Sequence, residues 1–201
     1  MAAPFGKETL YVKRLKTAIT MRSAFYGSLM LNLDFVPDPT VKTAEVDGTQ
    51  CRYNPTYVEE ELTFEQAQGL FAHESHHCGA NHHTRQGDRE LELYKYAADY
   101  ATNPEVLEAG FELPPGAVYD ERFKGMSVER IYNILDLQRQ LQQQCESNKP
   151  GGGGQGQGSG GQQPGGQQPQ PRTAQRSDGR WRLRCRFAAD QSPNRTSAHR
   201  G

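Results

Sequence analysis

The chain has 201 residues, and its 23 Lys and Arg against 24 Asp and Glu leave it close to neutral. A chain of this length predicts one modest globular domain, and the charge balance excludes a protein that overall charge would draw to nucleic acid or to a membrane. The four cysteines form no C-x-x-C pair, no apolar run reaches the roughly 18 residues of a membrane-spanning helix, and the N-terminus lacks the apolar core of a signal peptide. We therefore expect a soluble, cytoplasmic protein with reduced thiols.

The first third of the chain predicts a helix followed by a small sheet. Apolar side chains recur at helical spacing over residues 8–24, which indicates an amphipathic helix. Over residues 28–36 an apolar side chain recurs at every second position, and the segment ends before a Pro-Asp-Pro sequence. This pattern is typical of a strand. Residues 43–46 and 50–53 flank Asp47-Gly48, a dipeptide that accepts the positive φ values of a tight hairpin turn. Together these segments predict a small antiparallel sheet.

The next part of the chain predicts three helices. Thr63 and Gln66 have the spacing of a capping box, so a helix is expected to begin at Thr63 and to run through the histidines that follow. A second helix is predicted over about residues 89–102 and is expected to end there, because Pro104 disfavours the helical conformation of the residue before it. Ser127 is expected to cap the last helix, which has one apolar face.

The composition changes abruptly after residue 145. Residues 146–171 are dominated by Gly, Gln and Pro and contain no apolar side chain that could offset the entropy of ordering, so they predict a flexible linker. Residues 172–201 carry eight arginines and two aspartates, and we expect a disordered or non-native tail. A nucleic-acid-binding arm is the alternative, although the tail has no recognisable nucleic-acid motif. The folded domain is therefore predicted to span residues 1–145.

Five of the six histidines lie within residues 73–83. His73 and His77 are four residues apart on the predicted helix, so both imidazoles project from one face and can share one metal ion. Glu74 lies one step round, where it can take a proton from a metal-bound water without binding the ion itself. This H-E-x-x-H arrangement is that of zinc peptidases, and Zn²⁺ is the metal we expect, although Ni²⁺, Co²⁺ or Fe²⁺ would also fit. The alternative is an exposed, histidine-rich helix that matches the pattern by chance.

Motifs on both sides of the histidines complete a family pattern. Residues 53–66, 72–85, 96–103 and 110–116 resemble, in this order, segments of the metallopeptidase domain that precedes a von Willebrand A-like domain in bacterial and phage proteins. The family pattern is H-E-x-x-H-x-x-x-x-H-x-x-R followed by A-x-D-x-x-x-N, and the residues that match it here are His73, Glu74, His77, His82, Arg85, Asp99 and Asn103. This sequence departs from the pattern in two extra histidines, His76 and His83, and in having no von Willebrand A-like half.

The resemblance implies a zinc-dependent peptidase. It implies an α+β, zincin-like fold, in which a short antiparallel sheet packs with the histidine helix and a second helix supplies a further ligand. The substrate would be a peptide or protein, Glu74 would be the general base, and a von Willebrand A-like or ATPase protein would be a partner. Two other functions stay open: a non-catalytic binding module whose metal is a structural staple held by four ligands, and nucleic-acid binding through the tail.

The third zinc ligand has three candidates, which are Asp99, His82 and His83. On an unbroken helix His82 lies about 140° round from His77 and faces away from the ion, so it could bind only if the helix breaks near Gly79. Asp99 needs no such break, because it lies on the next predicted helix. We therefore rank Asp99 first, His82 second and His83 last, with His82 otherwise expected to orient Asp99.

Two polar residues near the motif have structural interpretations. Arg85 is expected either to pair with Asp99 or Glu92 and brace the site, or to be solvated. Cys78 lies beside His77 in the sequence but points further round the helix, so we interpret it as a small buried hydrophobe.

Overall fold

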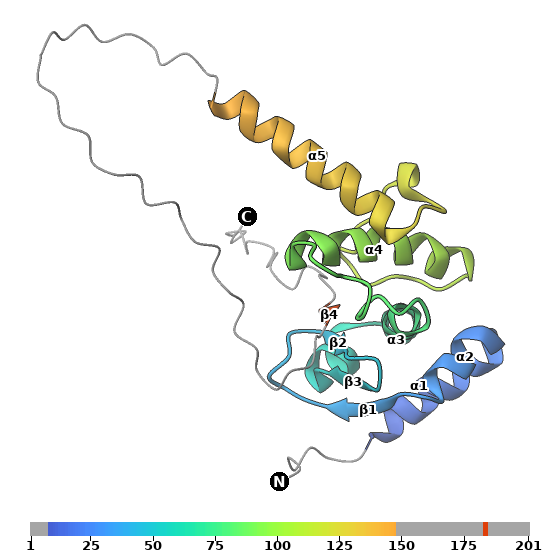
Figure 1. Ribbon diagram of the computed structural model, residues 1–201. Helices are drawn as coiled ribbons and strands as arrows, with labels where there is room; N and C mark the ends of the chain where they lie inside the picture. Colours follow the sequence, from blue (N-terminus) through green and yellow to red (C-terminus); the bar gives the residue numbers. More distant parts are fainter. Residues whose placement is uncertain (1–7, 148–182, 185–201) are drawn as a thin grey trace, which may run out of the picture.

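The computed structural model describes residues 8–147 and 183–184 (Figure 1). Its α-helices are α1 (Leu10–Arg22), α2 (Ala24–Met30), α3 (Phe64–Gly79), α4 (Leu91–Glu108) and α5 (Val128–Ser147). Two short helical segments are η1 (Tyr57–Glu61), a π-helix, and η2 (Glu121–Phe123), a 3₁₀-helix. The strands are β1 (Asp34–Pro37), β2 (Ala44–Val46), β3 (Gln50–Tyr53) and β4 (Leu183–Arg184). The protein is therefore an α+β protein, as the sequence predicts.

Helix α1 forms where the sequence predicts it. The Thr9 hydroxyl accepts a hydrogen bond from the backbone N–H of Val12, which caps the first turn, and Val12, Leu15 and Ile19 are buried on one face. The prediction of a strand over residues 28–36 is partly wrong, because α2 occupies its first three residues and β1 begins only at Asp34. An alternating sequence of this length also fits a short helix whose apolar residues are four apart, and packing against the core decides in favour of the helix here.

The sheet has the strand order β1-β3-β2-β4. β2 pairs with β3 in an antiparallel hairpin, and Gly48 at its turn has a φ of +94°, which confirms the expected hairpin. β1 pairs with β3 in parallel, so the expectation of a purely antiparallel sheet is wrong. β4 pairs with the outer edge of β2, and its two residues belong to the segment predicted as a tail. The linker from residue 148 on and the rest of that tail lie outside the described residues.

A buried carboxylate fastens the loop after β1 to strand β3. The Asp38 side chain accepts hydrogen bonds from the backbone N–H and the hydroxyl of Thr40, at 2.9 and 2.6 Å, and from Arg52 Nε at 2.7 Å. Burial opposes ionisation of Asp38, but the hydrogen bonds from Thr40 and the charge of Arg52 outweigh it and hold the pKa of this carboxyl below its ordinary value. Asp38 is therefore a charged group whose contact with Arg52 forms only when the chain folds.

Helix α3 begins at the predicted capping box. The Gln66 N–H donates to the Thr63 hydroxyl at 3.1 Å, and the Thr63 N–H donates to the Gln66 side-chain oxygen at 3.2 Å. The predicted last helix is also confirmed, since the Arg130 N–H donates to the Ser127 hydroxyl at the start of α5. The predicted end of α4 is wrong, because α4 continues through Pro104. A proline in a helix interior costs about 3 kcal/mol, and here the burial of the residues around it offsets that cost.

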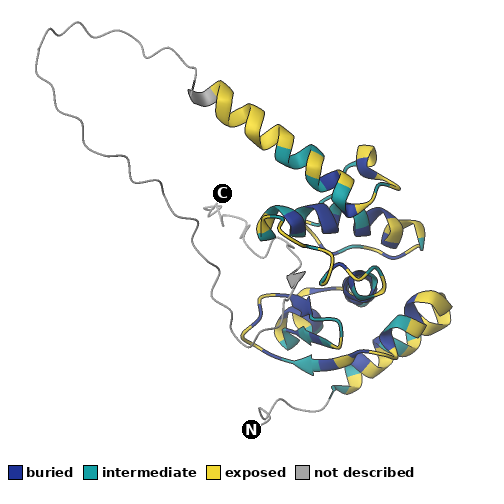
Figure 2. Ribbon diagram, in the orientation of Figure 1, coloured by how far each residue is buried: buried dark blue, intermediate teal, exposed yellow. Residues whose placement is uncertain are grey.

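Helix α3 lies at the centre of the molecule, between the sheet on one side and α4 on the other (Figure 1). α1 and α2 also pack against α3, while α5 packs on α4 and projects from it. Figure 2 shows that the buried residues concentrate on α3 and α4 and that the far half of α5 is exposed. Because α3 is covered on several sides, its polar residues His73, Glu74 and His77 are held in a largely water-free interior.

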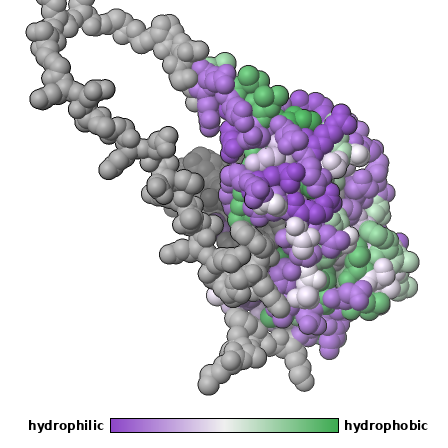
Figure 3. Space-filling model, viewed as in Figure 1, coloured by the Kyte–Doolittle hydropathy of each residue, from purple (hydrophilic) through white to green (hydrophobic). Residues whose placement is uncertain are grey.

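The surface is mixed in character. In the view of Figure 3, hydrophilic side chains cover most of the described part, and hydrophobic ones gather towards the side of α2, where Phe25 and Leu31 are exposed. Within residues 8–147 and 183–184, none of the helices combines the length and the apolar character that crossing a membrane demands.

Candidate metal centre

Three predicted site residues converge in the interior. His73 and His77 project from α3, and their Nε2 atoms are 2.7 Å apart. Asp99 projects from α4, and its Oδ1 lies 3.4 Å from His73 Nε2 and 3.2 Å from His77 Nε2. All three side chains are buried, and they are the one group among the described residues whose donor atoms are close enough together to hold a metal ion. The four-residue spacing on α3 and the facing position on α4 place two nitrogens and one carboxylate oxygen around one point.

Asn103 fixes the orientation of the His73 ring. Its Nδ2 donates to the backbone carbonyl of Val118 at 2.7 Å, so its Oδ1 is the atom that faces His73 Nδ1, at 2.6 Å. His73 therefore carries a proton on Nδ1, donates it to Asn103, and directs Nε2 towards Asp99. Asp99 and Asn103 are four residues apart, so the same face of α4 supplies both contacts. Asn103 is one of the residues that match the family pattern, and its four-residue spacing from Asp99 is the sequence signal of this shared face.

The chain turns sharply after α3 and brings His82 back towards the helix. The N–H of His82 donates to the carbonyl of His77, and the N–H of Asn81 donates to that of Cys78, each at 3.0 Å. Asn81 between them has a φ of +54°. These two bonds define a Schellman motif, in which the residue after the helix end adopts the left-handed conformation that asparagine tolerates. The helix thus does break at Gly79, and Asn81 is the residue in the sequence that could have indicated it.

His82 contacts the centre from outside. Its Nδ1 lies 2.8 Å from His77 Nδ1, on the opposite side of the His77 ring from Asp99, and its carbonyl accepts a hydrogen bond from the Tyr94 hydroxyl. The expectation that His82 would orient Asp99 is therefore wrong, because it orients His77 instead. His83 packs against the β2–β3 hairpin, where a Cβ on Gly48 would come within 2.4 Å of its Nε2, and its nitrogens are not among the converging donors.

The pKa values of the three side chains are shifted by burial and by one another. Burial opposes protonation of His73, but the hydrogen bond and charge of Asp99 outweigh it and raise its pKa. Burial and the neighbouring His73 lower the pKa of His77. Burial opposes ionisation of Asp99, but hydrogen bonds from the two imidazoles outweigh it and lower its pKa. Asp99 thus favours positive charge on the neighbouring imidazoles, and burial disfavours it, so a metal cation between the three donor atoms would take the place of a proton.

Glu74 is fully buried next to His73 on α3, and its carboxylate is not one of the converging donors. Its charge adds to the effect of burial in raising the pKa of two thiols, Cys51 in β3 and Cys78. Both thiols are consequently protonated at neutral pH and are poor metal ligands. Cys78 is partly buried and packs against the core, in agreement with its interpretation as a hydrophobe.

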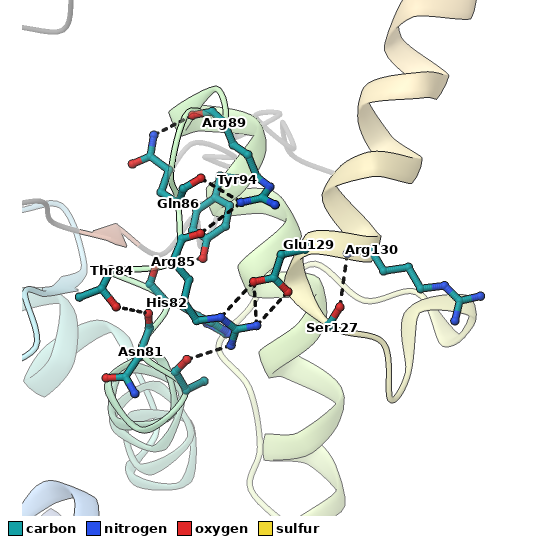
Figure 4. A network of polar contacts seen from close by, with 11 residues as sticks. Asn81, His82, Thr84, Arg85, Gln86, Arg89, Tyr94, Ser127, Glu129 and Arg130 are labelled. Carbon is teal, nitrogen blue, oxygen red and sulfur yellow. Dashed lines mark hydrogen bonds and ion pairs between the residues drawn. The ribbon is translucent and has the colours of Figure 1, made fainter.

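Arg85 braces the turn after α3. Its Nε and Nη2 donate to the two carboxylate oxygens of Glu129 at 3.0 and 2.8 Å, and its Nη1 donates to the carbonyl of Ala80 (Figure 4). The prediction that Arg85 pairs with Asp99 or Glu92 is therefore wrong. The Arg85–Glu129 pair links the turn containing His82 with the first turn of α5. No local sequence pattern indicates this pairing.

The comparison with known families agrees with this geometry. The family described as "Putative metallopeptidase domain" matches residues 11–199. The chain belongs to this family. The match to this metallopeptidase domain runs from α1 past β4, so it extends beyond residue 145, the predicted end of the folded part. A search of curated proteins and of solved structures finds no match.

Proposed function

We propose that the protein is a zinc-dependent peptidase that hydrolyses peptide bonds. The observation that carries the proposal is the convergence of His73 Nε2, His77 Nε2 and Asp99 Oδ1 at one buried point. Two imidazoles and one carboxylate are the number and kind of ligands in catalytic zinc sites, which keep a fourth position open for water or substrate. Membership of the metallopeptidase family supports the same class of reaction.

The donor set favours zinc and a catalytic role over a structural one. Neutral imidazole and carboxylate suit Zn²⁺, and the two nearest thiols stay protonated. A structural site would be closed by a fourth protein ligand. His82, the nearest further imidazole, directs Nδ1 at the His77 ring and not at the convergence point, so it supports an existing ligand. These contacts make a metal-stabilised binding module the less favoured function.

The residues around the donors have separable roles. His73, His77 and Asp99 would hold a zinc ion, which would act as a Lewis acid towards the scissile carbonyl and would lower the pKa of water to about 7. Glu74 accepts a proton as general base and then donates it to the leaving amine. Asn103 and His82 hold the two imidazoles in the orientation that presents Nε2. Burial of Glu74 keeps its carboxylate in a low-dielectric interior, where it is a stronger base towards a nearby proton.

A Glu74→Gln variant tests the proposal. We expect about one zinc per chain in the parent and in the variant, and cleavage of fluorescein-labelled casein by the parent alone. Glu65→Gln is the matched control, because Glu65 is exposed on the same helix and its variant should cleave at the parent rate. A Glu74→Gln chain as active as the parent would remove Glu74 from the mechanism. Zinc-loaded parent that melts higher than the zinc-free chain but cleaves nothing would support the structural role instead.

The remaining expectations about partners stay predictions. A von Willebrand A-like or ATPase partner is implied by the family resemblance alone. Nucleic-acid binding would require the basic segment 172–201, of which the structure describes only β4. Salt-sensitive binding that disappears when this segment is deleted would establish it.

A further inference from the structure

A pocket of about 360 Å³ lies beside the metal centre, between the end of α3, the middle of α4 and the turn before α5. This volume is within the range of about 300–1,000 Å³ that is usual for sites of small ligands. His76 and His82 form the wall nearest the centre, and His82 Nδ1 is 2.8 Å from His77 Nδ1. The ring of His82 therefore lies between the pocket and His77, a proposed zinc ligand, so the pocket is a neighbour of the centre on the Nδ1 side of that ligand.

The positive charge that lines the pocket, that of Arg85, is already paired with a carboxylate. Arg85 contributes to the wall, but its guanidinium donates to both carboxylate oxygens of Glu129 and to the carbonyl of Ala80 (Figure 4). A bidentate pair of this kind satisfies both the charge and the planar donor geometry of arginine. An acidic ligand would have to compete with Glu129 for this group.

The negative charge that lines the pocket is not matched. Glu105 on α4 contributes to the wall, and within the part of the chain that the structure describes no hydrogen bond or ion pair involves its carboxylate. Burial raises the pKa of the Tyr26 hydroxyl to about 12, and the negative charge of Glu105 adds to this effect. The Tyr26 hydroxyl lies 3.3 Å from His76 Nδ1, which places Glu105 close to the wall that faces the metal centre.

The rest of the wall is apolar or small. Ala101 from α4, Met126 from the turn before α5 and Val128 at the start of α5 also line the pocket. Methionine adapts its shape to the group that it contacts. A surface of this kind suits the methylene stem of lysine or arginine, which packs on apolar atoms while its charged end reaches a polar partner.

We propose that this pocket binds a lysine or arginine side chain of the peptide substrate, with the cationic end at Glu105 and the methylene stem against Ala101, Met126 and Val128. The pocket's role as a substrate site rests on the proposed peptidase function. A glutamate side chain in the same position would bring a second negative charge to Glu105, so acidic residues are disfavoured. A free terminal amine would satisfy Glu105 but would leave the apolar wall uncovered.

Binding is tested with fluorescent peptides and the zinc-loaded Glu74→Gln chain, which binds without cleaving. Three peptides are blocked at both ends and differ only in a central lysine, norleucine or glutamate, and a fourth has norleucine and a free N-terminal amine. We expect the lysine peptide to bind about tenfold more tightly than the blocked norleucine peptide, as one charge-assisted hydrogen bond implies. Equal binding of these two peptides, tightest binding of the glutamate peptide, or tighter binding of the free-amine peptide would each overturn the proposal.

Variants of two glutamates on α4 test which residue causes the preference for lysine. Adding Glu105→Gln should abolish the preference for lysine, and Glu105→Lys should turn it towards glutamate. Glu108→Gln is the matched control, because Glu108 is on the same helix but pairs with Lys124 outside the pocket, so its variant should keep the preference. A lysine preference that survives in Glu105→Gln would contradict the assignment.

The two proposals fail in different ways. A parent chain that cleaves lysine and glutamate peptides equally well refutes the pocket and leaves the peptidase function intact. A chain that prefers the lysine peptide in binding, loses this preference in Glu105→Gln and cleaves nothing refutes the peptidase function and retains the pocket.

Discussion

Replacement of Asn103 by alanine tests how Asn103 supports His73, one of the proposed zinc ligands. The variant removes the acceptor that lies 2.6 Å from His73 Nδ1 and the donor that lies 2.7 Å from the Val118 carbonyl. The three proposed donors stay in place, so zinc should still bind. Loss of a partner that orients a ligating histidine weakens metal binding about 10- to 100-fold, which corresponds to about 1.4–2.8 kcal/mol.

The same substitution should also lower the stability of the metal-free chain. Asn103 is 1% exposed, and its removal leaves the buried His73 N–H and the partly buried Val118 carbonyl without their partner. One buried group that loses its partner costs about 1–3 kcal/mol. The loss of zinc affinity must therefore be separated from a loss of folded protein.

Asn54→Ala makes that separation. Asn54 also donates from Nδ2 to a backbone carbonyl, that of Val41 at 3.0 Å, but it lies between β3 and η1 and not at the centre. Zinc affinity is measured by competition with a chromophoric chelator, and stability by thermal melting of the zinc-free chains. We expect both variants to melt lower and only Asn103→Ala to bind zinc more weakly. Parent-like zinc affinity in Asn103→Ala, or equal losses in both variants, would refute the assigned role of Asn103.

Four further substitutions test other parts of the structure. Asp99→Ala should lose zinc almost completely on gel filtration, whereas His82→Ala should retain it with an affinity about 10- to 100-fold lower in the chelator assay; full occupancy in Asp99→Ala would exclude it as a ligand. Gly69→Ala should lower the free energy of unfolding by about 1–3 kcal/mol or more and the denaturant midpoint with it, because the new Cβ would lie 1.8 Å from the carbonyl oxygen of Glu112. An unchanged midpoint would mean that α3 and the backbone at Glu112 pack less closely than described. Although burial opposes ionisation of Asp38, its hydrogen bonds lower its folded-state pKa, so its contribution to stability is complete above the ordinary value of 3.8 and is lost as the pH falls through the folded-state value. Asp38→Asn should therefore melt lower than the parent at neutral pH, and the difference should shrink in acid; a constant difference would contradict this.

The sequence by itself determined the elements that depend on neighbouring residues. The capping box of Thr63 and Gln66 placed the start of α3, and the four-residue spacing of His73 and His77 placed both imidazoles on one face. Gly48 supplied the positive φ of the hairpin. Each of these features is set by hydrogen bonds or sterics within about one turn of chain, so a short window of sequence contains all that decides it.

Other local signals in the sequence are weaker predictors of the structure. Asn81 can adopt the left-handed conformation that ends α3, and Asp99 and Asn103 have the spacing of one helix face. Pro104 argued against that helix, since its local cost is about 3 kcal/mol. Only the burial of the α4 residues around it reveals that packing offsets the local preference.

Tertiary structure alone decided how these elements meet. It placed a carboxylate oxygen of Asp99 beside Nε2 of both His73 and His77, joined Arg85 to Glu129, and set β1 parallel to β3. Each of these contacts joins segments that are brought together by burial of apolar side chains elsewhere in the chain. Burial is non-directional and fixes position only when the whole core is packed, so the partner of a given polar residue follows from the packed fold and not from its own place in the sequence.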